Sequence, residues 1–163
     1  MKKFIALLLA LIATLSFTAC GKTAEPEEPD TLSGKLIAAF EDAVKADSNA
    51  DAEALAVKIS ENELFPFMTL ATPLDSDGWF PGLNAVPEGF ESAASFGPAI
   101  STIPFIGYVF ELKDGIDADT FVKSLEDSAD LGWNICTHAD EMASGIAGNK
   151  VCFVMTPASF DEE

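Results

Sequence analysis

The feature that most constrains the fold lies in the last third of the chain, where two short apolar runs flank one helical pattern. Phe105–Leu112 and Val151–Met155 are each long enough for a strand and too short for a buried helix. Between them, Asp117 or Asp119 can cap a helix that Gly132 ends. Strands and a helix in this order predict an α+β domain.

Two weaker elements lie between that helix and the last strand. Trp133–Cys136 predicts a further short strand, and Asp140–Met142 predicts a brief helical turn closed by Gly145 or Gly148. The expected fold is therefore a small sheet of three or four strands, with helices packed mainly on one face.

The first half of the chain predicts a helix pair followed by an irregular region. Apolar residues recur at helical spacing within residues 32–47 and again within residues 50–62. Leu64–Ala71 is a short apolar run and predicts a buried or edge strand. From Pro73 to Pro104, prolines and glycines recur too often for regular structure, so we expect a long Pro/Gly-rich loop region.

The N-terminus has the layout of an export signal. Two lysines precede an uncharged run, Phe4 to Ala19, that is too short to span a membrane comfortably. Phe17–Thr18–Ala19–Cys20 resembles the lipobox of bacterial lipoproteins. The resemblance implies a signal peptide over residues 1–19 and a diacylglyceryl group, with fatty chains such as palmitate, on Cys20. Soluble secretion with cleavage after Cys20 is the alternative.

A lipoprotein of this kind divides into four segments. After the signal peptide, residues 20–31 are expected to be the lipidated cysteine and an acidic, proline-bearing tether. Residues 32–157 are expected to form a single globular α+β domain, and residues 158–163 an acidic tail. The protein would then lie outside the cytoplasm, anchored by its lipid to the bacterial cell membrane.

The charge balance excludes nucleic acid as a partner. The chain has 27 Asp+Glu against 9 Lys+Arg, all of them lysine, and loss of the two N-terminal lysines takes the formal charge from −18 to −20. An acidic protein without arginine is repelled by phosphate backbones and by an anionic leaflet. The sequence therefore predicts contact with the membrane through the lipid anchor only. The charge predicts a highly soluble surface, and steering of cationic ligands or divalent metals is the alternative.

Four segments resemble a group of uncharacterised lipoproteins from anaerobic gut bacteria: Ile103–Phe110, Trp133–Thr137, Ala139–Glu141 and Lys150–Pro157. The resemblance covers about residues 60–157. It implies a lipoprotein and brings no activity with it.

Aromatic side chains are the candidates for a ligand site. Trp79, Phe80, Tyr108 and Trp133 could line a groove for a sugar or a peptide, because aromatic rings are the usual platform for such ligands. The alternative is that these rings pack in the core, which is their commoner place.

Cys136 and Cys152 are the one possible disulfide pair once Cys20 carries lipid. Both fall in predicted strands of an exported protein, where a bridge is permitted. Two buried thiols acting as small hydrophobic side chains are the alternative. Cys136 with His138 and Asp140 is a weak candidate for a nucleophile, a base and an orienting group, because their spacing on a strand is loose.

Asp75 and Asp77 are weak candidates for a calcium site. The EF-hand pattern fails here because Trp79 and Val86 stand where it needs oxygen ligands, and a turn is the alternative. The motifs of the common catalytic and cofactor sites are missing from the sequence, so we expect no cofactor.

The expected function is non-enzymatic binding of an envelope protein, a peptide or a glycan. The alternative is an envelope hydrolase that uses carboxylates of residues 73–104. A transport substrate-binding lipoprotein is a third class, but such proteins need two lobes, for which this chain is too short.

Overall fold

The computed structural model describes residues 29–86, 88–100 and 102–160. Within them the elements are α2 (Leu32–Ala46), α3 (Ala52–Ser60), β1 (Thr69–Leu74), β2 (Phe90–Pro98), β3 (Ile106–Leu112), α4 (Ala118–Ser128), β4 (Glu141–Ala147) and β5 (Lys150–Thr156). The predicted signal peptide, the lipobox with Cys20, most of the tether and the last three acidic residues lie outside the described residues. No helix in the described part is long and apolar enough to cross a membrane.

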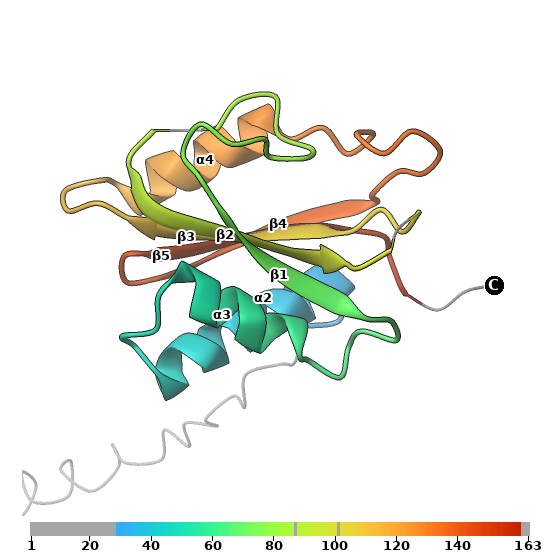
Figure 1. Cartoon of the computed structure of the whole chain (residues 1–163), viewed down its shortest axis with the longest axis horizontal. Helices are drawn as coiled ribbons and strands as arrows, with labels where there is room; N and C mark the ends of the chain where they lie inside the picture. Colours follow the sequence, from blue (N-terminus) through green and yellow to red (C-terminus); the bar gives the residue numbers. More distant parts are fainter. Residues whose placement is uncertain (1–28, 87, 101, 161–163) are drawn as a thin grey trace, which may run out of the picture.

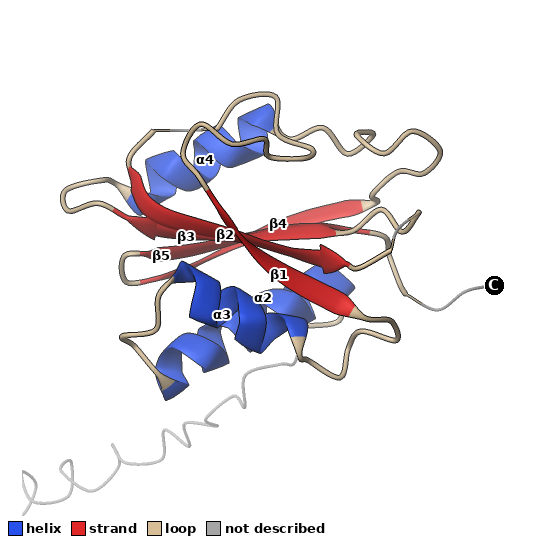
Figure 2. Ribbon diagram, viewed as in Figure 1, coloured by secondary structure: helices blue, strands red, loops and turns tan. Residues whose placement is uncertain are grey.

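The five strands form one antiparallel sheet in the order β1-β2-β3-β5-β4. Helices α2 and α3 cover one face of this sheet, and α4 lies on the other face (Figures 1 and 2). The α+β class is therefore confirmed. The expected N-terminal helix pair is present as α2 and α3; the described residues form five strands where three or four were expected, and α4 lies on the face opposite to the pair (Figure 1).

Each face of the sheet has its own hydrophobic core. Under α2 and α3, large side chains such as Phe40 and Ile59 pack against Phe96 and Val154 of the strands. Under α4, a second core holds Phe80, Phe90, Tyr108, Phe110, Phe121, Leu125, Phe153 and Met155. Strand β5 lies between the two cores and is buried along its whole length.

The three helices begin at side-chain caps. Thr31, Asp51 and Asp117 each accept a hydrogen bond from a backbone N–H of the following turn. Hydrogen bonds from the hydroxyl and the backbone N–H of Thr120 lower the pKa of the Asp117 carboxyl. Helix α4 ends at Ser128, so the predicted cap at Gly132 is wrong.

Several predicted strands and turns are corrected by the structure. The strand expected at Leu64–Ala71 is displaced to β1, and Trp133–Cys136 forms turns and bends instead of a strand. Strand β2 lies inside the region expected to be loop, and β4 replaces the helical turn expected from Asp140. Within the segment expected to be an acidic tail, the centroid of the Phe160 ring lies within 5.5 Å of those of Phe65, Phe67 and Phe105.

Candidate functional site

A cleft of about 630 Å³ opens beside the C-terminal end of α4, over the ends of β2 and β3. This volume is within the range of small-ligand sites. Two connections form its walls and lie side by side in Figure 1: the one between β1 and β2, and the one between α4 and β4. The described lining residues are Trp79, Phe80, Pro81, Gly82, Leu83, Asn84, Gly97, Pro98, Ile103, Phe105, Ile106, Asp130, Trp133, Asn134 and Ile135.

Backbone hydrogen bonds tie the two walls together. The N–H of Asp130 donates to the carbonyl of Gly82 at 2.8 Å, and the N–H of Asn84 donates to the carbonyl of Ser128 at 2.9 Å. Leu83 and Ala129 form an isolated antiparallel bridge between these bonds. The two tryptophans of the cleft are therefore carried on segments that hold each other in place, which lowers the entropic cost of ordering a binding surface.

Tyr108 fixes the first wall to the sheet. Its hydroxyl donates to the carbonyl of Pro81, and burial of the ring on β3 raises the pKa of the phenol. Gly82 allows the close approach that follows: its φ is +79°, and a Cβ there would lie 2.5 Å from Cε of Met155 and 3.1 Å from the Trp133 ring. A side chain at Gly82 would push the wall off the sheet.

The cleft offers an apolar platform with a few neutral polar groups. Trp79 is 80% exposed and Ile135 is 98% exposed, while Trp133 is half-buried. Asn84 and Asn134 supply amide groups among the described lining residues. Asp130 supplies the one carboxylate of that set, and its Oδ1 already accepts from the N–H of Gly132 at 2.9 Å.

The four predicted ligand-binding aromatic residues divide between the cleft and the core. Trp79 and Trp133 line the cleft with accessible surface. Phe80 also borders it but is 2% exposed, and its ring stacks on Phe110 with centroids 6.0 Å apart. Tyr108 does not line the cleft, because it is fully buried under it. Trp79 and Trp133 therefore lie where a ligand could reach them, whereas Phe80 and Tyr108 are packed in the core.

Sequence reasoning missed the polar residues of the cleft and Ile135. Asn134 and Ile135 fall where a strand was expected, and alternation on that strand would have buried one of them. Asp130 follows the end of α4, where an acidic residue carries no local signal of a site. The pairing of Leu83 with Ala129, which brings the walls together, joins segments that are distant in sequence.

The two candidate disulfide cysteines are free thiols. Cys136 is exposed in the connection after α4, and Cys152 is fully buried in β5. Burial raises the pKa of the Cys152 thiol, as expected for the buried-thiol alternative. The expectation of neighbouring strands at these positions is wrong, because Cys136 does not lie in a strand.

The weak catalytic and metal candidates gain no support from their surroundings. Asp140, the possible third group beside Cys136 and His138, accepts instead from the N–H of Ala158 at 3.0 Å. Asp75 and Asp77 are exposed in a turn closed by a hydrogen bond from Gly78 N–H to the Asp75 carbonyl. No group of three or more His, Cys, Asp and Glu that could hold a metal gathers within the described residues.

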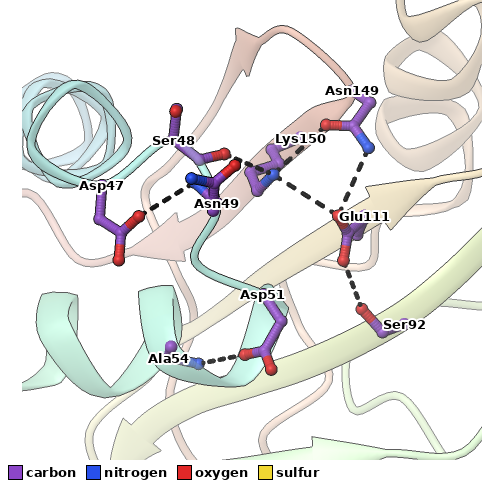
Figure 3. Close-up of polar contacts among 9 residues, drawn as sticks. All are labelled: Asp47, Ser48, Asn49, Asp51, Ala54, Ser92, Glu111, Asn149 and Lys150. Atoms are coloured by element: carbon purple, nitrogen blue, oxygen red, sulfur yellow. Dashed lines mark hydrogen bonds and ion pairs between the residues drawn. The ribbon is translucent and has the colours of Figure 1, made fainter.

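A cluster of polar side chains lies at the end of the sheet opposite to the cleft (Figure 3). Nζ of the buried Lys150 donates to the carbonyl of Ser48 at 3.2 Å and to Oδ1 of Asn149 at 3.3 Å, and lies 3.5 Å from Oε1 of Glu111. Ser92 Oγ donates to the other oxygen of Glu111 at 3.3 Å. These contacts tie the turn between α2 and α3 to the sheet, so we assign the cluster to stability.

Comparisons of the chain with protein-family models, with curated proteins and with solved structures find no match. The functional conclusion therefore rests on the cleft.

Proposed function

We propose that the protein is a lipid-anchored, extracytoplasmic binding protein that takes a neutral saccharide in this cleft. The observation that carries the proposal is the convergence of Trp79 and Trp133, which come from separate connections, on one accessible cleft. The flat apolar face of a sugar ring packs on such a platform. The amides of Asn84 and Asn134 can donate to and accept from its hydroxyl groups.

Charge narrows the ligand class. The described lining residues include no lysine, and the expected mature chain carries −20. An anionic ligand would meet repulsion without a compensating cation, so a neutral ligand fits better. The hydrolase alternative would need carboxylates aimed at the scissile bond. Asp75, Asp77, Glu88 and Glu91 are the carboxylates of residues 73–104, and none of them lines the cleft.

Intrinsic fluorescence tests the proposal directly. Trp79 and Trp133 are the two tryptophans of the chain, so tryptophan emission reports the cleft without background. Titration with neutral cello-, malto-, manno- and chito-oligosaccharides should give a saturable change in emission for at least one series. Trp79→Ala should weaken that binding about 3- to 10-fold, the range expected for one lost aromatic contact.

Val57→Ala is the matched control, since Val57 is an exposed apolar residue on α3, away from the cleft. It should leave the affinity unchanged. An absence of saturable change with every series, or an affinity that Trp79→Ala does not alter, would refute saccharide binding in the cleft.

A further inference from the structure

Charge is distributed unevenly between the two ends of the sheet. One end is formed where β2 stops and β3 begins, and it also receives the start of β1 and the end of β5. Residues 64–74, 92–110, 131–139 and 151–160 meet there and contain no Asp, Glu or Lys, while the charged residues Asp30, Lys35, Glu63, Asp130, Asp140 and Glu141 border them. We call this the uncharged end; it lies on the right in Figure 1.

Large apolar side chains project into solvent at the uncharged end. Met68 is 74% exposed and Ile100 is 94% exposed, and the exposed Trp79 and Ile135 line the cleft at this end. Hydrogen bonds join the connections that carry them: Ala99 N–H donates to the Met68 carbonyl at 2.9 Å. The hydroxyl of Thr137 donates to the carbonyl of Thr102 at 2.9 Å. Several exposed apolar residues gathered on joined loops indicate an interaction surface.

The opposite end is charged. It holds the polar cluster of Figure 3, with Lys150 and Glu111, and the turns that carry Asp47, Asp51 and Asp114. The contrast gives the domain one end suited to water and one end suited to a less polar surface.

The chain enters the domain at the uncharged end. Asp30, Leu32, Lys35 and Glu63 line a groove with Pro66 and Phe160. Pro66 and Phe160 also line the neighbouring groove that contains Ile103. Cys20, the expected lipid site, is separated from this entry by residues 21–29. Covalent geometry limits their span to about 30 Å, so the anchor would keep the uncharged end close to the bilayer.

We propose that the uncharged end docks on the bilayer that holds the lipid anchor, with Trp79, Ile100 and Ile135 in the interfacial layer. The proposal rests on the proposed lipid anchoring. It changes the expectation that the lipid alone makes contact with the membrane, because the exposed apolar side chains at this end add a contact that does not depend on charge. Tryptophan side chains favour the interface, where the indole N–H can still bond to polar groups.

A short tether makes weak docking sufficient. Confinement within about 30 Å raises the effective concentration of the bilayer at the domain into the millimolar range, so each contact need contribute little. Two of the acidic groups that border this end accept hydrogen bonds from backbone groups: Asp130 accepts from Gly132 N–H, and Asp140 accepts from Ala158 N–H. Trp79 and Ile135 belong both to the docking surface and to the cleft, so docking and ligand binding compete for them.

The test uses quenching of tryptophan by brominated lipid chains. The purified lipoprotein with Trp133→Phe, which retains Trp79 as its tryptophan, is reconstituted in phosphatidylcholine vesicles with and without bromine on the acyl chains. We expect about a twofold loss of emission with brominated lipid, since an interfacial indole reaches the chain region. The control carries Trp79→Phe, Trp133→Phe and Ile116→Trp, which moves the reporter to the exposed Ile116 next to Asp117, and should show no loss.

A second variant separates docking from anchoring. Ile100→Ser with Ile135→Ser removes two side chains that are more than nine-tenths exposed, so the fold should be retained while quenching of Trp79 falls to the control level. Intact mass and vesicle flotation report the anchor independently. If the mass shows a free thiol at Cys20, the anchoring proposal fails. Docking is then measured on a Cys136→Ser chain coupled through Cys20 to a maleimide lipid.

The outcomes that overturn the docking proposal are distinct from failure of the anchor. Vesicle-bound protein with unquenched Trp79 would show that the uncharged end faces away from the bilayer and would assign it to a protein partner. Equal quenching of the Trp79 reporter and the control reporter would show that the domain has no preferred orientation. Either result would refute docking through this end.

Discussion

Removal of the carboxylate beside Lys150 should destabilise the domain more than removal of both charges together. The Lys150 side chain is 5% exposed and Glu111 is 23% exposed, with Nζ 3.5 Å from Oε1. Breaking a fully buried pair costs about 3–5 kcal/mol, and breaking an exposed pair costs about 0–1 kcal/mol. The partial exposure of Glu111 and the long contact place Glu111→Leu between these limits, at about 2 kcal/mol.

The double variant Glu111→Leu with Lys150→Met isolates the contribution of the charges of this pair to the free energy of unfolding. It removes both charges at similar volume, a change that is often neutral or stabilising at buried pairs. The carbonyl of Ser48 and the amide of Asn149 lose a donor, but both residues are exposed and can bond to water. We therefore expect the double variant to be more stable than Glu111→Leu by about 1 kcal/mol or more.

Urea denaturation followed by circular dichroism measures these differences, provided that the slope against urea is unchanged. The Glu111→Leu change corresponds to a fall in melting temperature of about 8 °C for a domain of this size. The reasoning fails if Glu111→Leu and the double variant are equally stable, because the Lys150 ammonium would then gain nothing from the Glu111 carboxylate.

Two further predictions follow from burial in the sheet. Cys136 should be alkylated in the native protein and Cys152 only after unfolding, because Cys152 is fully buried; intact mass checks this, and rapid labelling of Cys152 would contradict its burial. Gly107→Ala should cost about 1–3 kcal/mol in a urea titration, because the added Cβ would lie 2.2 Å from the Phe96 ring. Phe96→Leu in the same chain should recover part of that loss, and an unchanged stability of Gly107→Ala alone would show that the ring can move aside.

The helices and strands that the sequence predicted correctly are those with a clear pattern of large apolar side chains. Strands β3 and β5 lie where Phe105–Leu112 and Val151–Met155 predicted them, and both are shared by the two cores. Helices α2 and α3 lie within or close to the two segments of helical spacing, 32–47 and 50–62. In these segments, burial and local preference favour the same structure, so the sequence is unambiguous.

Strands β2 and β4 were missed because they are built largely of small residues. In β2, Gly97 and Pro98 lie at the end of the strand, whereas the sequence pattern suggested that they prevent regular structure there. In β4, Gly145 is required because a Cβ would lie 2.6 Å from Ile37 of α2. Small residues that let a helix approach a sheet have low strand preference, so tertiary packing decides against the local signal.

The candidate site was predictable in its residue types and not in its assembly. Trp79, Phe80, Tyr108 and Trp133 were candidates because aromatic rings are the usual platform for a ligand, and of these Trp79 and Trp133 line the cleft with accessible surface. Their meeting depends on Leu83 reaching Ala129 and on Tyr108 holding Pro81, which are contacts between distant parts of the chain. The spacing of apolar residues along the chain carries no information about which distant segments will contact each other.

The position of β5 has a consequence for biosynthesis. This strand follows the other four described strands along the chain, and it joins β3 to β4 and borders both cores. In a nascent chain that stops short of Lys150, β3 has an unpaired edge and β4 has no neighbouring strand. Neither hydrophobic core can then be completed. Both cores are therefore completed only after Lys150–Thr156 has been synthesised.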